Sequence, residues 1–200
     1  ANRMLSNGTQ DNNGHWFGHG TASLDVTSTT VAGAQGVGGS QIVGDKFFCK
    51  YLKINLEFSQ SGNQFGSGSN YYFNELTVTV YILLDRHSNS GLTAETAAPE
   101  LWLETPDDGP QSFRKRGSGR DFRVLKKHTM KLRGIHAVEN GTLQTRKGHI
   151  CVPISTVKRP DPEDETRWDH GVYLLAHLDH PDSTVSYTLN YNTRLSYTDA

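Results

Sequence analysis

The carboxyl-terminal part of the chain reads VSYTLNYNTRLSY over residues 185–197. Every second residue from Val185 to Tyr191 is apolar or aromatic, and Leu195 and Tyr197 continue the same face. Serine, threonine and asparagine fill the positions between Val185 and Tyr191. Because successive side chains of a strand point to opposite faces of a sheet, this alternation predicts a strand with one buried face.

The same alternation recurs along the chain, and it predicts strands over residues 46–59, 75–85 and 172–179. A further strand is expected over residues 122–132. Lys126 and His128 interrupt its apolar face, so we expect a bulge or a wet strand end there. Residues 150–154 form a short strand that Pro153 places near a sheet edge.

The turns and loops between these strands carry their own signals. Asn140-Gly141 predicts a hairpin turn, because both residues tolerate a positive φ. Residues 93–98 are expected to form one or two helical turns that Pro99 stops. Two long loops, Arg86–Gly119 and Arg159–Asp169, have the length of functional surfaces.

Seven or eight short strands without a long helix predict an all-β protein. With 200 residues, the chain is expected to fold as a single domain, an antiparallel jelly-roll β-sandwich with long loops. Residues 1–20, rich in Gly and Asn, are expected to form an extended arm, and residues 21–200 the jelly roll. We expect three groups to face one core: Leu76/Val78/Val80/Ile82, Leu52/Ile54/Leu56 and Tyr187/Leu189/Tyr191.

The formal net charge of −1 conceals an uneven distribution of charge. Residues 111–147 contain eleven basic and two acidic side chains, a local net charge of +9, whereas the remainder of the chain carries −10. Such a block is either a solvated face or the contact surface for an anionic partner such as nucleic acid. The candidate phosphate-binding residues are Arg114, Lys115, Arg116, Arg120, Lys126, Lys127, Lys131 and Arg133.

These candidates cannot all lie on one face, because Lys126 and Lys127 are adjacent in a predicted strand. The alternative role for some of them is to pair with acids such as Asp107, Asp108 or Glu163 of a neighbouring subunit. Only two aromatic residues, Phe113 and Phe122, accompany the cations. Contacts to the phosphate backbone without base readout fit this pattern best.

Enzyme signatures are largely missing from the sequence, and we expect neither an enzyme nor a cofactor. The chain contains no nucleophile elbow, phosphate-binding loop or dinucleotide fingerprint. Two histidine pairs, His15/His19 and His177/His180, are too poor in ligands to predict a metal site. A carbohydrate-binding or glycan-hydrolysing β-sandwich remains the alternative function, because two carboxylates from distant strands can meet in a fold of this kind.

Four segments, taken together, resemble the coat proteins of small icosahedral viruses. The resemblance is to circular single-stranded DNA virus capsids of the geminivirus-like kind and to the satellite tobacco necrosis virus type. It covers the chain from about Thr21 to the end. The segments are residues 43–54 (VGDKFFCKYLKI), 80–86 (VYILLDR), 120–127 (RDFRVLKK) and 189–200 (LNYNTRLSYTDA).

This resemblance implies a capsid protein that assembles with itself into an icosahedral shell of about sixty copies. It also implies a packaged nucleic acid, with DNA favoured over RNA, and a place in the virion, with assembly in the host nucleus for a DNA virus. No membrane partner is expected, because the apolar runs are too short to span a bilayer. These families carry a basic amino-terminal arm, whereas residues 1–20 here contain only Arg3. Either a preceding arm was removed or the basic stretch takes over its role.

Overall fold

The computed structural model of the chain describes residues 2–13, 15–17, 46–61, 76–86, 99–132, 145–158, 170–179 and 186–199. The strands in these ranges are β1 (Asn2–Asn13), β2 (Trp16–Phe17), β3 (Phe47–Ser61), β4 (Leu76–Asp85), β5 (Phe122–Leu132), β6 (Thr145–Lys158), β7 (Val172–Leu178) and β8 (Ser186–Asp199). The helical elements are α2 (Pro99–Trp102), the 3-10 helix η1 (Pro106–Gln111) and α3 (Ser118–Asp121).

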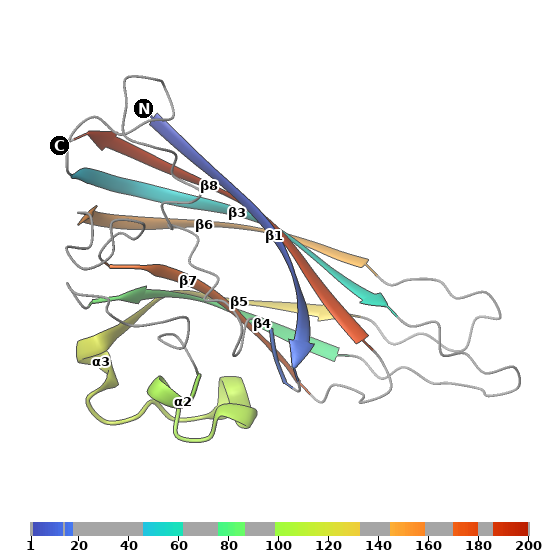
Figure 1. Ribbon diagram of the computed structural model, residues 1–200. Coiled ribbons are helices and arrows are strands. Elements are labelled where there is room, and N and C mark those ends of the chain that lie inside the picture. The colour runs from blue at the N-terminus through green and yellow to red at the C-terminus, as the bar shows by residue number, and fades with distance from the viewer. Residues whose placement is uncertain are drawn as a thin grey trace, which may run out of the picture.

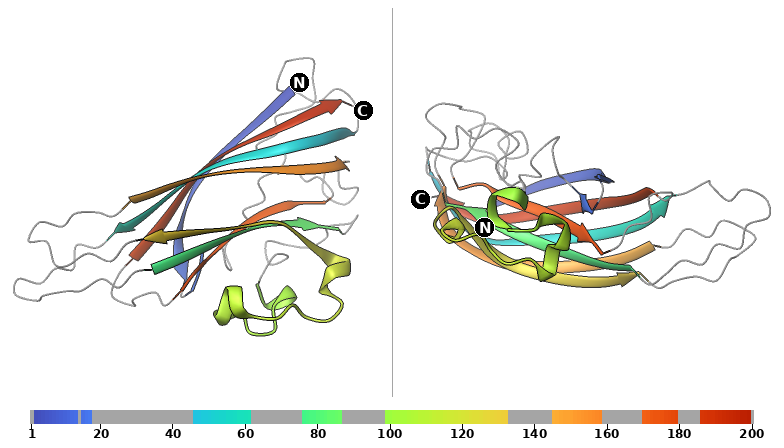
Figure 2. Two further views of the ribbon diagram at one scale, coloured as in Figure 1. Left: turned by 180° about the vertical axis from the view of Figure 1, so that it is seen from behind. Right: turned by 90° about the horizontal axis from the view of Figure 1, so that it is seen from below.

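The strands form two antiparallel sheets that pack as a sandwich (Figures 1 and 2). The first sheet has the order β1-β8-β3-β6, and the second has the order β2-β7-β4-β5. The first strand, β1, joins the two sheets. Its residues up to Asp11 pair with β8, whereas Asn12 and Asn13 pair with β2.

The path of the chain through these strands is that of a jelly roll. No two neighbours within the first sheet are consecutive in sequence, because the chain crosses to the second sheet after β1, β3 and β6. This order is the double Greek key of a jelly-roll sandwich. The predicted fold class is therefore confirmed, with seven full strands and the two-residue β2.

The main core lies between the two sheets. All three groups of side chains expected to face it are buried there: Leu76, Val78, Val80, Ile82, Leu52, Ile54, Leu56, Tyr187, Leu189 and Tyr191. Inward-facing residues of β6 and β7, such as Ile150 and Leu174, complete it. Burying one such aliphatic side chain contributes about 1.5–3 kcal/mol, so the alternating apolar positions of these strands stabilise the sandwich directly.

The two edge strands agree with their sequence signals. Strand β6 is the last strand of the first sheet, so Pro153 lies at an edge as predicted. The pairing of β6 with β3 begins at Thr145, which makes the strand longer than its apolar residues suggested. Strand β5 is the last strand of the second sheet. Its register with β4 shifts between Ile82 and Leu83, which leaves Leu125 as the extra residue of the expected bulge.

One expectation differs from the structure. The jelly roll begins before residue 21, because residues 2–13 of the expected arm form β1, in which residues 2–11 pair with β8 and residues 12–13 pair with β2. A ladder of backbone hydrogen bonds needs no apolar period, so no alternation of residue types predicted this strand. Pro99 is the first residue of helix α2, a helix that the sequence pattern did not predict. Proline is favoured in the first turn, since its missing N–H would be unpaired there.

Several predicted features lie outside the described residues. They are the helical turns over residues 93–98, the hairpin turn at Asn140-Gly141, the loop Arg159–Asp169, and the candidate Arg133.

Candidate nucleic-acid interface

Residues 99–121, which we call the covering segment, lie on the outer face of the second sheet (Figure 1). Strands β4 and β7 carry large, buried side chains on both of their faces, so this outer face also has apolar residues to cover. Trp102 and Leu103 of the covering segment pack on it in a second apolar cluster with Trp16, Tyr81, Leu83, Phe122, Tyr173 and Leu175. Strand β7 is therefore buried along its whole length.

The covering segment folds back on itself as a small hairpin around η1. Leu103 and Arg114 form an antiparallel bridge. The N–H of Glu104 donates to the carbonyl of Phe113 at 3.0 Å, and the N–H of Lys115 donates to the carbonyl of Trp102 at 3.0 Å. These bonds fix the backbone from Phe113 to Lys115. Arg114 and Lys115, the first basic residues of the segment, therefore lie on an ordered strand of the hairpin.

Three side chains of the second sheet form polar contacts with the hairpin. The indole N–H of Trp16 donates to the carbonyl of Pro106 at 3.0 Å, and Nε2 of His177 lies 2.8 Å from the carbonyl oxygen of Asp107. The Nζ of Lys127 on β5 lies 3.5 Å from the carbonyl oxygen of Pro110. Each contact goes to a backbone carbonyl of η1, so the sheet holds the segment through main-chain atoms.

Helix α3 carries the segment back into β5. Gly117 precedes it with a φ of 92°, a conformation that glycine adopts without strain. The hydroxyl of Ser118 donates to the carbonyl of Lys115 at 2.8 Å. The guanidinium of Arg86, at the end of β4, donates to the carbonyl of Gly119 at 3.1 Å. These bonds bring Arg86 beside Arg120.

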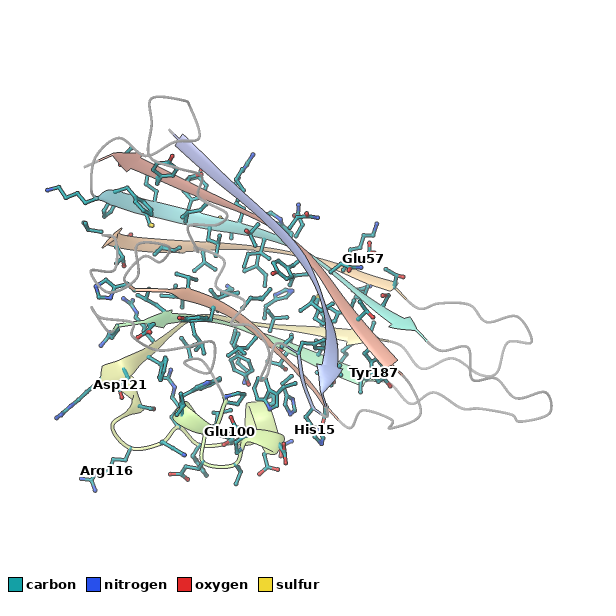
Figure 3. The ribbon with its side chains drawn as sticks, in the orientation of Figure 1. His15, Glu57, Glu100, Arg116, Asp121 and Tyr187 are labelled. Atoms are coloured by element: carbon teal, nitrogen blue, oxygen red, sulfur yellow. The ribbon has the colours of Figure 1, made fainter. Side chains whose placement is uncertain are left out.

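The seven predicted cations that the structure describes are all exposed: Arg114, Lys115, Arg116, Arg120, Lys126, Lys127 and Lys131. The first four lie along the covering segment, and the side chain of Arg116 points away from the sheets (Figure 3). Lys127 and Lys131 sit at the register positions of Tyr81 and Thr77, on the covered face of the second sheet. Six cations thus belong to one side of the molecule, which we call the basic surface.

Lys126 does not belong to the basic surface. Its register partner is Ile82, whose side chain faces the main core. Paired residues on antiparallel strands share a face, so Lys126 lies on the core side at the edge of the sheet, opposite to the basic surface. The expected separation of Lys126 from Lys127 is therefore present in the structure. Two exposed arginines that we did not select, Arg86 and Arg123, also lie near α3. Arg123 was within the basic stretch, whereas Arg86 is far from it in sequence.

The four cations of the covering segment are not neutralised by ion pairs within the part of the chain that the structure describes. Arg114, Lys115, Arg116 and Arg120 form no ion pair with a described residue. Lys127 lies over the ring of Tyr81, 5.8 Å from its centroid. The surface therefore presents several unpaired cations to solvent, an arrangement that favours an anionic partner.

The first half of the covering segment has the opposite charge. Its exposed acids are Glu100, Glu104, Asp107 and Asp108. Phe113 lies at the boundary between the acidic and basic halves, and 78% of its surface is exposed. Phe122, the other aromatic residue of the basic stretch, is buried in the second cluster. The sequence alone did not separate the roles of these two rings.

The two candidate histidine clusters meet in space. The rings of His15 and His177 stack with their centroids 5.5 Å apart, whereas His19 and His180 lie outside the described residues. Within the described ranges, no group of three or more His, Cys, Asp or Glu side chains is placed to hold a metal ion. Nor is any helix there long and apolar enough to cross a bilayer.

Comparison with known proteins adds no relative: no protein-family model and no curated protein matches this sequence.

Proposed function

We propose that this protein is a viral capsid subunit that assembles with itself into an icosahedral shell and binds the packaged genome through the basic surface. The observation that carries the proposal is the exposure of Arg114, Lys115, Arg116 and Arg120, which form no ion pair with a described residue, on one side of a jelly-roll sandwich. A shell of about sixty copies is the simplest closed assembly for a subunit of this size. The proposed site of action is the virion, with assembly in the host nucleus if the genome is DNA.

The chemistry of the basic surface suits phosphates. Arg114, Lys115, Arg116 and Arg120 lie on neighbouring turns of one ordered segment, so several phosphates of a single strand can be neutralised together. Each such contact releases counterions from the nucleic acid, which favours binding without any readout of sequence. The proposed preference for DNA over RNA rests on the resemblance of the sequence to circular single-stranded DNA virus capsids.

The same segment also offers a surface for contacts between subunits. Phe113 is an exposed apolar ring between the acidic half and the basic half of the covering segment. Two copies related by a rotation can place the acidic half of one covering segment against the basic half of the next. A contact of this kind uses two different patches, as closed rings require.

The alternative function, binding or hydrolysis of carbohydrate, would use exposed aromatic rings against a sugar. Trp16 and Trp102 are not available for that role, because both are buried in the second cluster, and Trp168 lies outside the described residues. Binding to a glycan array, without particles, would favour this alternative.

Electron microscopy of the purified protein, combined with nucleic-acid binding, tests the proposal. We expect closed particles, and we expect the triple change Arg114→Ala, Lys115→Ala, Arg116→Ala to lower the packaged nucleic acid while empty shells still form. The matched control removes three exposed cations in or directly before strands of the first sheet, Lys46, Lys50 and Arg146, and should leave packaging unchanged. A stable monomer without particles under any salt or pH condition would overturn assembly. Loss of assembly with unchanged nucleic-acid affinity of the free subunit would show that the triple site is an interface.

A further inference from the structure

His177 fastens the covering segment to the second sheet. Its side chain is 2% exposed, and its Nε2 lies 2.8 Å from the carbonyl oxygen of Asp107. A carbonyl oxygen only accepts hydrogen bonds, so Nε2 carries the proton and donates. The Nδ1 of a neutral ring is then an unprotonated acceptor. This atom is buried and has no hydrogen-bond partner among the described residues.

The imidazole is enclosed on several sides. The ring of His15 stacks on it at an interplanar angle of 13°, and Trp16 meets it edge-on with the ring centroids 4.9 Å apart. On the side of the covering segment, Gly109 has a φ of 45°, and a Cβ at this position would overlap the imidazole. The glycine therefore allows the backbone of η1 to lie directly on the ring.

A second proton on His177 has no favourable place in this arrangement. It would give Nδ1 an N–H that lacks an acceptor and would put a positive charge in a buried site, both of which are costly. Burial lowers the pKa of His177 below its ordinary value of 6.5, and the neighbouring His15 lowers it further. The hydrogen bond to Asp107 and the charges of Asp179 and Asp107 oppose this shift without reversing it.

The groups that face His177 come from every element packed around it. They are His15 beside β2, Asp107 on η1 and Asp179 after β7, while Lys127 on β5 lies over Tyr81 on the same face. His15 is itself oriented by its Nδ1, which lies 3.0 Å from the carbonyl oxygen of Leu178. The two rings are thus held in a stack, and positive charges on both rings would repel each other.

We propose that the contact between His177 and η1 is an acid-sensitive latch, and that protonation of His177 releases the covering segment from the outer face of the second sheet. Release disturbs the positions of Phe113 and of Arg114, Lys115 and Arg116, because their backbone is ordered by the same hairpin. The inference rests on the fold and goes beyond the proposed capsid role. In a shell, it would make the basic surface respond to acid.

The sign of the effect follows from linkage. Because the pKa is lower in the closed state, the released state binds more protons, and the closed state loses stability as the pH falls below about 6.5. Each unit of difference between the two pKa values raises the opening constant about tenfold at low pH. The closed state is fully favoured above the ordinary pKa.

Hydrogen exchange measured by mass spectrometry at pH 7.5 and pH 5.0, corrected for intrinsic exchange, tests the latch on the free subunit. We expect peptides from residues 99–121 to lose protection at pH 5.0 by several-fold in rate, while peptides from β3 and β8 keep theirs. His177→Gln keeps a donor for Asp107 but cannot titrate, so its protection should not change with pH. The control His149→Gln alters an exposed histidine of β6 and should keep the full response.

Two further variants keep the test decisive if His177→Gln does not fold. His15→Asn removes the repulsion, raises the pKa of the closed state towards its ordinary value and should reduce the acid response. Gly109→Ala should expose the covering segment at both pH values, which marks the released state. Equal protection of wild-type residues 99–121 at pH 7.5 and 5.0, or a wild-type response in His177→Gln, would overturn the latch. Neither result bears on whether particles form.

Discussion

The indole N–H of Trp16 donates a hydrogen bond to the carbonyl oxygen of Pro106 over 3.0 Å, although 90 positions separate the two residues in the chain. The ring of Trp16 also packs edge-on against Trp102, with centroids 6.3 Å apart. A strand of two residues, β2, thus holds the covering segment with one polar and one apolar contact.

Replacement of Trp16 by Phe should destabilise the protein more than replacement of Trp102 by Phe. Both changes remove the same volume from the second cluster. Trp16 additionally loses its hydrogen bond to Pro106, whereas the Nε1 of Trp102 is buried with no hydrogen-bond partner among the described residues. The difference in unfolding free energy, measured with urea, should be about 1 kcal/mol. Equal losses would contradict an energetic role for the bond.

Lys126 and Lys127 provide a matched pair for the basic surface, because they are adjacent cations on opposite faces of β5. If the basic surface binds nucleic acid, Lys127→Ala should reduce the slope of log affinity against log salt, by about 0.7 for a single strand. Lys126→Ala should leave the slope close to that of the wild type. Titration of a labelled oligonucleotide at several salt concentrations measures both slopes. Identical slopes for the two variants would show that the two faces of β5 contribute equally to nucleic-acid binding, which contradicts the basic surface.

Removal of the exposed ring of Phe113 should affect assembly and spare the subunit. Phe113→Ser should raise the protein concentration at which particles appear, since an apolar contact across subunits is lost. The free energy of unfolding should stay within about 0.5 kcal/mol of the wild type, because the ring is 78% exposed. Light scattering and urea unfolding follow the two quantities. The control Val157→Ser changes an exposed apolar residue of β6 and should not alter the assembly threshold.

Tyr81 gives a prediction at alkaline pH. Burial raises its pKa from 10.0 to about 12, so the folded state holds its phenolic proton where the unfolded chain has lost it. Stability should therefore fall as the pH rises from 10 to 12, by an amount on the order of 2 kcal/mol. Tyr81→Phe should show a smaller fall over this range than the wild type. Absorbance at the phenolate band, recorded beside urea unfolding, shows whether the ionisation and the loss coincide.

The sandwich was predictable from the sequence, whereas the covering segment was not. Residues 76–85 and 187–197 carry apolar side chains at every second position or nearly so, which is the spacing of side chains on one face of a strand. Trp102 belongs to a helix of four residues, which is too short to show any period, and its partner Trp16 is remote in sequence. The approach of His15 to His177 depends likewise on the pairing of β2 with β7.

The basic surface was predictable as a list of residues but not as a surface. Local charge identified Arg114 to Arg120, because these residues are close in sequence. The division of β5 needed the bulge at Leu125, which sets the register of every later residue of the strand with β4. Arg86 joins α3 through Gly119, a contact across 33 positions for which the sequence carries no signal.

The strand order of the first sheet also determines when the protein can fold. Strands β1 and β3 both lie against β8, so neither can complete its pairing until β8 has left the ribosome. During synthesis, the apolar faces of Leu52, Ile54 and Leu56 have no final partner on one side. Contacts of such long sequence separation fold on the slow, millisecond-to-second end of the range. The nascent chain is thus exposed to aggregation until β8 inserts between β1 and β3.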